Sequence, residues 1–407
     1  MTRVPESREE AVARDRADPL ARARSKFKLP DGVTYLVGHS LGPAPHTAIK
    51  AVNHVASEEW ATGMVRSWNT AGWIDLTSRV GSKIAPLIGA QRDEVVVCDS
   101  VSVNIFKLAA SALDCVSEQR IIVEDDEFPT DQYVAEGLAD LADVTFDKIP
   151  AGTAIDALSG GGVLIKSAVN YRTSEIVDIE AFERAASVHG ALIVWDLSHA
   201  TGIVDLDLPA SKAMLAVGCT YKYLNGGPGA PAFLYVARGL IDQLKTPLPG
   251  WLGHAAPFAF SNTYEPAPGA ERFVVGTPGI LSLSALSASL SLFDGVSVAN
   301  LHAKAQALGD LCLSRATEIG LPSQSPPIGV KRGGHVSLKH EAGCAISQAL
   351  AARGRLIDFR TPDTIRFGFS PLFLSYAEVW DTMDDLEEIM RDRVWEEAQY
   401  QVSAKVT

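Results

Sequence analysis

"GCTYKYLNGGPGAP", residues 218–231, places a lysine at the end of an apolar run. The preceding "AMLAV" is typical of a buried strand, and the Gly/Pro-rich segment that follows is typical of a tight turn. A lysine at such a turn most often points to water. In a crevice, however, a partly desolvated lysine is a nucleophile that can form a Schiff base. Lys222 is therefore either a turn residue or a covalent anchor, and its surroundings must decide.

The sequence around Lys222 alternates between short apolar runs and helix-like stretches. The runs are rich in β-branched residues and read "EVVVCDS", "RIIVEDDEF", "GVLIKSAVN", "ALIVWDLSH" and "PAFLYVA". Such alternation predicts parallel strands joined by helical crossovers. Ligands of open α/β sheets bind outside the carboxyl ends of the strands, so the polar residues there should line one crevice. These residues are Asp99, Ser100, Asp125, Asp126, Ser167 and Asp196.

The chain divides into an arm and two domains. We expect residues 48–296 to form the large α/β domain and residues 297–407 to form a smaller α+β domain. Residues 1–47 read as an arm with an exposed helix, which we expect to pack on the small domain or on a partner subunit. The boundary near residue 297 rests on a later Pro/Gly-rich segment, "SQSPPIGVKRG", followed by strand-like and helix-like runs.

Composition narrows the functional class. The 407 residues carry a net charge of -13, which argues against nucleic acid or an anionic membrane as partner. The five cysteines are scattered without a CxxC pair, which argues against a disulfide framework or a zinc site. No metal-ligand spacing occurs. No apolar run reaches the length of a membrane span and no secretory signal is recognisable, so we expect a cytoplasmic protein.

Two further segments bear on Lys222. In "VWDLSHATG", Asp196 ends a strand and His199 follows three residues later. Asp196 could cap a helix, but a carboxylate facing the crevice can also pair with a cationic ligand nitrogen. In "CDSVSVNIFKL", Ser100 and Ser102 stand at a strand-to-helix junction, where they could simply cap the helix or help to bind a phosphate. A lysine, an aspartate and an anion site are together what pyridoxal phosphate (PLP) requires of a protein.

Seven segments, in order along nearly the whole chain, resemble the kynureninase family. They are "YLVGHSLGPAP", "EFPTDQY", "VNYRTSEIVDI", "WDLSHATGIVDLDL", "GCTYKYLNGGPGAPAFLYV", "GWLGH" and "IRFGFSPLF". Kynureninases are PLP-dependent hydrolases of the class V aminotransferase-like group, fold type I. The resemblance implies a mostly parallel sheet in the large domain, a small α+β C-terminal domain and a homodimer with its active site at the subunit interface.

The resemblance also implies roles for individual residues. Lys222 resembles the Schiff-base lysine, Asp196 the partner of the pyridine nitrogen, and Arg366 the arginine that binds the substrate α-carboxylate. Tyr221 resembles either a proton donor or a phosphate contact, with even weight on the two. The other cofactor contacts would be Val101, Ser102, Phe128, Ser167 and His199, with Trp251 and Thr277 supplied by the second subunit.

The implied reaction is hydrolysis of the Cβ–Cγ bond of L-kynurenine or 3-hydroxykynurenine, which gives anthranilate or its hydroxy derivative and L-alanine. The sequence departs from the family in the expected substrate pocket. The family motif Gly-Asn-Ser-Leu-Gly reads "GHSLG" here, with His39 for asparagine and Ser40 retained. Met64 stands where relatives carry His or Trp, so a ring-substituted kynurenine of secondary metabolism is an alternative substrate. Gly276 and Thr277 resemble the bacterial ring-recognition loop, which favours kynurenine.

Three other functions compete with this interpretation. A cysteine desulfurase shares the fold, but it typically has a histidine before the lysine, where this chain has Tyr221, and it needs a reactive cysteine on a mobile loop. Cys312 and Cys344 both lie in helix-like apolar patterns. A catalytically silent PLP-fold protein should lack Lys222, Asp196 or Arg366, and none is missing. A nicotinamide-dependent oxidoreductase is disfavoured because no GxGxxG follows a first strand.

Overall fold

The computed structural model describes residues 3–401 and contains a seven-stranded sheet with the order β2-β8-β7-β6-β5-β3-β4. All strands run parallel except β8, which is antiparallel to both of its neighbours. The strands are β2 (Val95–Val97), β3 (Arg120–Glu124), β4 (Thr145–Ile149), β5 (Val163–Ser167), β6 (Leu192–Asp196), β7 (Leu215–Gly218) and β8 (Phe233–Val236). The expected mostly parallel sheet is therefore confirmed.

Nothing in the sequence pattern singled out β8 as the strand that runs antiparallel. A parallel pair needs a crossover of a dozen or more residues, usually a helix, before the chain can re-enter the sheet in the same direction. Residues 219–232, which connect β7 to β8 and contain Lys222, form turns and no helix. The chain therefore re-enters the sheet in the opposite direction. The sequence "PAFLYVA" is strand-forming in either direction, so its composition could not reveal the reversal.

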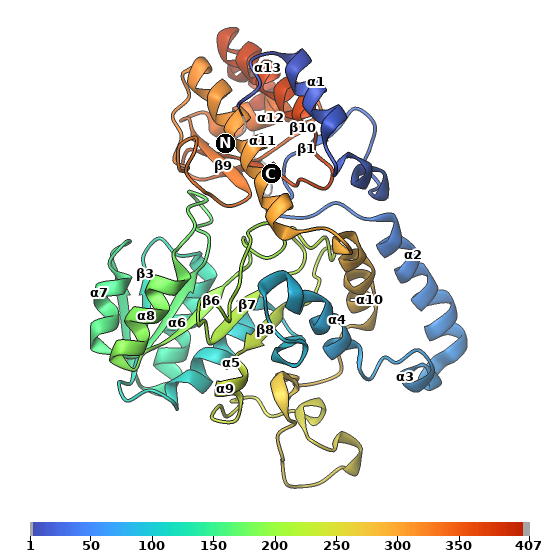
Figure 1. Cartoon of the computed structure of the whole chain (residues 1–407), viewed down its shortest axis with the longest axis vertical. Coiled ribbons are helices and arrows are strands. Elements are labelled where there is room, and N and C mark those ends of the chain that lie inside the picture. Colours follow the sequence, from blue (N-terminus) through green and yellow to red (C-terminus); the bar gives the residue numbers. More distant parts are fainter. Residues whose placement is uncertain (1–2, 402–407) are drawn as a thin grey trace.

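Helices cover both faces of this sheet (Figure 1). The helices of the large part are α2 (His46–His54), α3 (Ser67–Thr70), α4 (Leu76–Ile84), α5 (Val101–Leu113), α6 (Pro129–Ala142), α7 (Ala154–Ala157), α8 (Ile179–His189), α9 (Arg238–Ile241) and α10 (Ile280–Ser289). Successive residues of each strand face opposite sides. In β6, for example, Ile193 and Trp195 belong to one buried cluster and Val194 to the other. The sheet therefore separates two hydrophobic cores.

A second layer lies above the large sheet in Figure 1 and is built on a three-stranded antiparallel sheet. Its elements are α11 (Val298–Ile319), β9 (His335–Lys339), α12 (Gly343–Ala352), β10 (Arg355–Leu356), β11 (Asp358–Arg360), β12 (Thr364–Gly368) and α13 (Tyr376–Arg391). The N-terminal helix α1 (Arg8–Ala17) packs against α13, and the short strand β1 (Thr34–Tyr35) pairs with β10. The N-terminal arm is thus bound to the C-terminal part of the chain.

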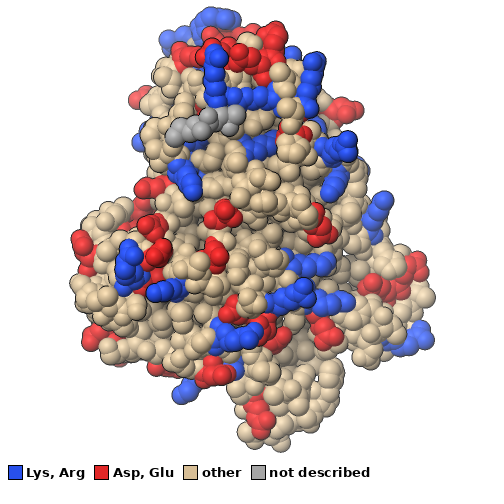
Figure 2. All heavy atoms as spheres, viewed as in Figure 1, with Lys and Arg blue, Asp and Glu red and all other residues tan. Residues whose placement is uncertain are grey.

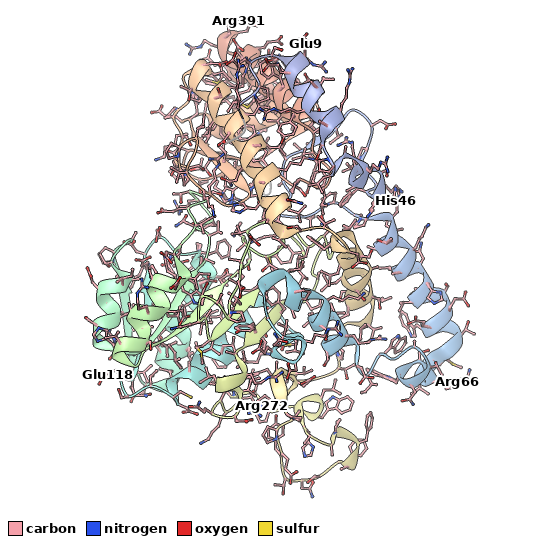
Figure 3. All side chains as sticks on the ribbon, viewed as in Figure 1. Glu9, His46, Arg66, Glu118, Arg272 and Arg391 are labelled. Atoms are coloured by element: carbon pink, nitrogen blue, oxygen red, sulfur yellow. The ribbon has the colours of Figure 1, made fainter. Side chains whose placement is uncertain are left out.

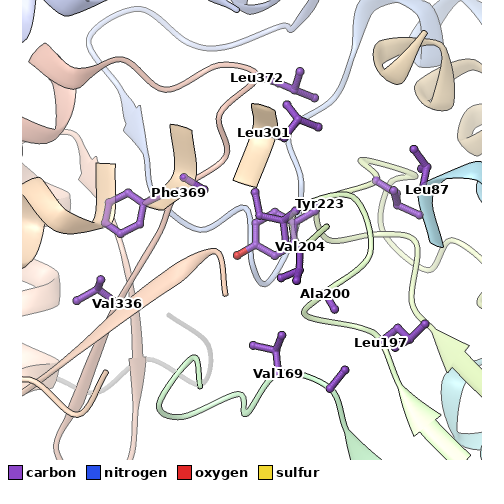
Figure 4. Packing of buried hydrophobic residues seen from close by; sticks show 14 of the residues in the cluster. Leu87, Val169, Leu197, Ala200, Val204, Tyr223, Leu301, Val336, Phe369 and Leu372 are labelled. Atoms are coloured by element: carbon purple, nitrogen blue, oxygen red, sulfur yellow. The ribbon is translucent and has the colours of Figure 1, made fainter. Parts of the chain in front are cut away.

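The two parts share one buried hydrophobic cluster. Figure 4 shows Val204 and Tyr223 of the large part at the centre of this cluster, with Leu197 on one side and Val336 and Phe369 of the C-terminal part on the other. Burial of apolar surface on both sides fixes the C-terminal part against the carboxyl end of the large sheet. The strand β12, which carries Arg366, is therefore held over the crevice where Lys222 lies.

Within residues 3–401, no single helix has both the length and the apolar composition needed to cross a membrane. One sharply bent pair, Ile280–Phe293 with Val298–Ile319, meets those criteria only when its two members are taken together.

Candidate active site

A pocket of about 250 Å³ opens at the carboxyl ends of the parallel strands. Ser167 and Asp196 end β5 and β6 as direct register partners, and Lys222 follows the end of the next strand, β7. The lining residues come from six separate stretches of the chain. They are Asp99, Ser100, Val101, Ser102, Phe128, Thr130, Asp131, Ser167, Tyr171, Asp196, Ser198, His199, Cys219, Tyr221, Lys222, Gly229, Ala230 and Ala232. The polar strand ends that the sequence placed in one crevice include four of these: Asp99, Ser100, Ser167 and Asp196.

Asp196 is buried at the base of this pocket. Its Oδ1 accepts a hydrogen bond from the backbone N–H of Ser198 at 2.8 Å. Burial raises the pKa of Asp196 above its usual value, while Lys222 and the Ser198 hydrogen bond act in the opposite direction. A cationic nitrogen in the pocket would also lower the pKa of Asp196 and so favour its ionised carboxylate. Asp196 can therefore pair with a protonated heterocyclic nitrogen.

Lys222 lies in the connection between β7 and β8, half-buried beside His199. Its Nζ atom is 3.4 Å from each ring nitrogen of His199. Burial, followed by the charge of Lys222, lowers the pKa of His199 well below its usual value, so this imidazole is neutral. The amine of Lys222 therefore faces the pocket next to a neutral, polar ring.

The N-terminal arm holds the backbone beside Lys222. The N–H of Gly42 donates to the carbonyl of Tyr221 at 2.7 Å. A Cβ atom on Gly42 would lie 2.3 Å from the carbonyl oxygen of Lys222, so only glycine allows this approach. The glycine-rich segment "GHSLG" thus supports the lysine loop, which the sequence alone did not reveal.

The N-terminus of α5 is the predicted anion site. Ser100 caps this helix by accepting a hydrogen bond from the N–H of Val103, and Val101 and Ser102 form its first turn. The first N–H groups of a helix have no partner within the helix, and together with the helix dipole they favour a phosphate. Capping by Ser100 does not conflict with the predicted phosphate contact, because Val101 and Ser102, in the first turn of this helix, both line the pocket.

The aromatic rings of Phe128 and Tyr171 form part of another wall of the pocket. Phe128 precedes α6, keeps 41% of its surface exposed and meets Tyr171 edge to face at a centroid distance of 5.2 Å. The loop that carries Phe128 is tied to the sheet through Glu127, whose carboxylate accepts from Lys166 at 2.8 Å. An exposed ring on a fixed loop can stack on a planar ligand.

Asp131 is a pocket residue that sequence reasoning missed. It lies in the first turn of α6, is almost fully buried, and its Oδ2 has no hydrogen-bond partner among residues 3–401. Burial, followed by the charge of Asp196, raises the pKa of Asp131 well above its usual value. The available signal was its place three residues after Phe128 in "EFPTDQY".

Arg366 and His39 meet deeper between the two parts of the chain. Arg366 donates to the carbonyl of the pocket residue Tyr171 at 2.8 Å and pairs with Asp358. His39 lies 3.4 Å from the same Asp358 carboxylate, and Ser40 follows it in the turn that leads to Gly42. Three of the segments singled out in the sequence therefore converge here, whereas Asp358 carried no sequence signal.

Seven predicted site residues are not among those that line this pocket. Three of them, His39, Ser40 and Arg366, lie in the contact region between the two parts of the chain described above. The other four are Met64, Trp251, Gly276 and Thr277. Met64 is 59% exposed and adopts a positive φ of 49°, near the outer tip where Figure 3 shows Arg66. Trp251 is 39% exposed and packs against the exposed ring of Phe258. Within residues 3–401, these four residues therefore do not line the pocket that contains Lys222 and Asp196.

The pocket residues suit PLP in their chemistry. A lysine amine, a buried aspartate at the end of the neighbouring strand, a helix N-terminus and an exposed phenyl ring meet the needs of its aldehyde, ring nitrogen, phosphate and ring face. Solved structures with this fold include a C-DES mutant with glycine covalently linked to its PLP cofactor. That structure has a TM-score of 0.79 and 16% identity, and the match covers 90% of this chain and 99% of that one.

The cysteine desulfurase of Thermococcus onnurineus NA1 has the same fold, with a TM-score of 0.78, 18% identity and coverage of 96% of this chain and 99% of the other. At these identities the likeness concerns the fold alone. The fold and the pocket together define a PLP-dependent enzyme of fold type I, class V group.

Sequence comparison identifies the family within that class. Residues 301–386 match the family model described as the kynureninase C-terminal domain. Kynureninase of Pseudomonas fluorescens is 42% identical over 98% of this chain and 100% of its own length, and that of Burkholderia mallei (strain SAVP1) is equally similar. The chain belongs to the kynureninase family.

Proposed function

We propose that this chain hydrolyses the Cβ–Cγ bond of L-kynurenine to give anthranilate and L-alanine. The observations that carry the proposal are Lys222 and Asp196 in one pocket and Arg366 hydrogen-bonded to the backbone of the pocket residue Tyr171, in a chain 42% identical over its length to kynureninases. When bound, PLP withdraws electrons from the α-carbon of an amino acid joined to it. All other steps fall to the residues of the chain and to water.

Each residue acts on a stated group. Lys222 would hold the cofactor through its amine and would take the proton from the substrate Cα. Asp196 would accept a hydrogen bond from the ring nitrogen of bound PLP and so keep that nitrogen protonated. Arg366 binds the α-carboxylate through its guanidinium group. Water adds at the γ-carbonyl before the Cβ–Cγ bond breaks.

Tyr221 has two alternative roles, proton donor and phosphate contact. Its ring lies beside Lys222, with Nζ 5.9 Å from the ring centre, and burial raises the pKa of its hydroxyl above the usual value. A hydroxyl that holds its proton can donate to the leaving group in the later steps or to the phosphate. Tyr221→Phe separates these: loss of turnover with unchanged cofactor affinity favours proton donation, and loss of cofactor affinity favours phosphate binding.

We propose that the active unit is a homodimer in the cytoplasm. Trp251, Phe258 and Phe260 are exposed aromatic residues in a projecting segment, which is yellow at the bottom of Figure 1. Figure 2 shows few charged side chains on that projection. Exposed aromatic patches of this kind mark protein–protein contacts. A second subunit would give Trp251 and Thr277 a pocket to complete.

The test is a product assay of the purified holoenzyme against L-kynurenine, 3-hydroxykynurenine and ring-substituted kynurenines, with alanine release measured for each. We expect L-kynurenine to be cleaved most efficiently, and we expect Lys222→Ala to release no alanine. Alanine and sulfur release from cysteine, without cleavage of any kynurenine, would instead support a desulfurase.

A further inference from the structure

The guanidinium of Arg366 is held on two of its three nitrogens. Nη2 forms an ion pair with Asp358, and Nη1 donates to the backbone carbonyl of Tyr171 at 2.8 Å. Nε is buried and has no hydrogen-bond partner within residues 3–401. Because a guanidinium is planar, fixing two nitrogens fixes the direction of the third. Nε is therefore the one nitrogen of Arg366 that no described residue occupies.

The partner carboxylate is built into the sheet. Asp358 on β11 and Arg366 on β12 are direct register partners across an antiparallel pair. Arg360, two residues after Asp358, lies 3.1 Å from the same Oδ2 atom and is partly exposed. Burial would raise the pKa of Asp358, but the polar contact with His39 and the charge of Arg366 together hold that pKa below its usual value. Among residues 3–401, two guanidinium groups share this one carboxylate, which leaves an excess of one positive charge in the group of three.

His39 adds a third contact to Asp358. Its ring is fully buried, with Nε2 3.4 Å from Asp358 Oδ2. The ring stacks on His335 at a centroid distance of 5.3 Å and an interplanar angle of 16°. Room for it depends on Gly368, where a Cβ atom would lie 2.0 Å from His39 Nδ1. Burial and Arg366 lower the pKa of His39 to about 4, so the ring is neutral and leaves the charge balance unchanged.

We propose that Asp358 and His39 are positioning residues of the substrate-carboxylate site, which orient Arg366 so that its free edge meets the α-carboxylate. This inference rests on the proposed function, because it takes Arg366 as the carboxylate-binding residue. The excess positive charge of Arg360 and Arg366 over Asp358 is what an incoming carboxylate would neutralise. His39 holds Asp358 from the N-terminal arm, so the arm and both strands act on one guanidinium.

If the Asp358–Arg366 pair had only a structural role, breaking it would affect the binding of every ligand alike. Breaking a buried ion pair destabilises a protein whatever the ligand. Orientation of Arg366 matters only for ligands that carry a carboxylate. Kynurenamine, which is kynurenine without its α-carboxylate, separates the two roles because it presents the same ring, carbonyl and amine.

The experiment measures dissociation constants of L-kynurenine and kynurenamine for the holoenzyme from changes in its absorption spectrum, with kcat and KM for kynurenine. We expect Asp358→Asn to weaken kynurenine binding roughly 10- to 100-fold, the range of a charge-assisted hydrogen bond, and to leave kynurenamine binding unchanged. His39→Asn should retain affinity because its amide can still donate to Asp358, whereas His39→Ala should lose part of it. KM should rise more than kcat falls.

Asp310→Asn is the matched control, because Asp310 is the ion-pair partner of another buried arginine, Arg332, in the same part of the chain. Melting temperatures show whether each variant is folded, and His39→Ala serves as the second probe if Asp358→Asn is not. Equal weakening of both ligands by Asp358→Asn, or by His39→Ala where that is the probe used, would overturn the positioning role.

The background variant Arg366→Ala tests the underlying assignment separately. If Asp358 acts through Arg366, adding Asp358→Asn to Arg366→Ala should have no further effect on kynurenine affinity. An undiminished effect in that background refutes the positioning role while the proposed function stands. If Arg366→Ala itself weakens both ligands equally, then the carboxylate site is elsewhere, and the positioning role fails with it.

Discussion

The Nζ atom of Lys222 lies 3.4 Å from both ring nitrogens of His199. His199 follows β6 and Lys222 follows β7, so two neighbouring parallel strands bring these side chains together. Since burial and the lysine charge keep His199 neutral, the imidazole can accept a hydrogen bond from the ammonium group. The contact with His199 therefore holds the Lys222 side chain in the pocket after the end of β7.

Lys222→Ala should abolish kynurenine hydrolysis. The variant loses both the covalent anchor and the group that takes the Cα proton, and general base catalysis alone contributes roughly 10²–10⁴-fold. Borohydride should attach the cofactor to Lys222 in the wild-type protein, detected by mass spectrometry of the peptide, and attach none in the variant. Lys212→Ala, a turn lysine before the same strand, is the control. Wild-type turnover in Lys222→Ala would refute the assignment.

Inactive variants of two kinds should complement each other if Trp251 completes the partner's pocket. A Lys222→Ala subunit paired with a Trp251→Ala subunit then forms one site with both an intact lysine and an intact tryptophan. After random reassociation of equal amounts, about one quarter of wild-type activity should return. Activity that stays at the sum of the two separate variants would place Trp251 in its own subunit's pocket or outside any pocket.

Met64→His should change substrate preference. An imidazole can hydrogen-bond to a ring hydroxyl, whereas methionine cannot, and one hydrogen bond contributes about 0.5–1.5 kcal/mol. We expect the ratio of kcat/KM for 3-hydroxykynurenine over kynurenine to rise roughly 2- to 10-fold. The neighbouring Val65→His is the control, since Val65 is also exposed. No change in the ratio would place Met64 outside the ring pocket.

Glu183 should make stability depend on pH. Burial raises its pKa to about 7, even though its carboxylate accepts a hydrogen bond from Trp195 Nε1 at 2.7 Å. The native state therefore holds a proton more firmly than the unfolded chain, whose pKa is near 4.5, so the free energy of unfolding falls as pH rises between these values. The difference corresponds to about 3 kcal/mol.

Glu183→Gln removes that titration. Denaturant unfolding at pH 4.5 and at pH 8 should show the variant gaining up to about 3 kcal/mol over wild type across this interval. Glu180→Gln, an exposed position on the same helix, should keep the wild-type dependence. Parallel pH profiles for Glu183→Gln and wild type would show that Glu183 titrates at an ordinary pH.

Gly368→Ala should destabilise the protein. The added Cβ would lie 2.0 Å from Nδ1 of the buried His39, so the ring or the strand must move, at a cost of about 1–3 kcal/mol. Gly137→Ala is a matched control in the middle of α6, where a Cβ meets nothing within 4 Å. That change should stabilise by up to about 1 kcal/mol, because alanine favours helix. Thermal unfolding would measure both, and equal stability of Gly368→Ala and wild type would contradict the tight packing of His39.

The sequence predicted the carboxyl-end crevice because its signals are local. A β-branched run followed by a polar residue is visible in one segment, and this placed Ser167 and Asp196 at strand ends and brought Lys222 to the same edge. The family resemblance named the cofactor, and the comparisons confirm the family and the fold class. The site roles of individual residues stay predictions that the variants above test.

Contacts between distant segments were beyond the sequence. The reversal of β8 depends on what residues 219–232 can span, the support of Tyr221 by Gly42 joins segments about 180 residues apart, and Asp358 meets Arg366 only through the register of β11 and β12. Strand propensity and hydrophobic period record which residues are buried, but not which buried residues meet. The sequence by itself determined the order of elements and the chemistry at the strand ends. Only the tertiary structure decided the environment of Arg366, because packing of the arm and the C-terminal part against the sheet sets those distances.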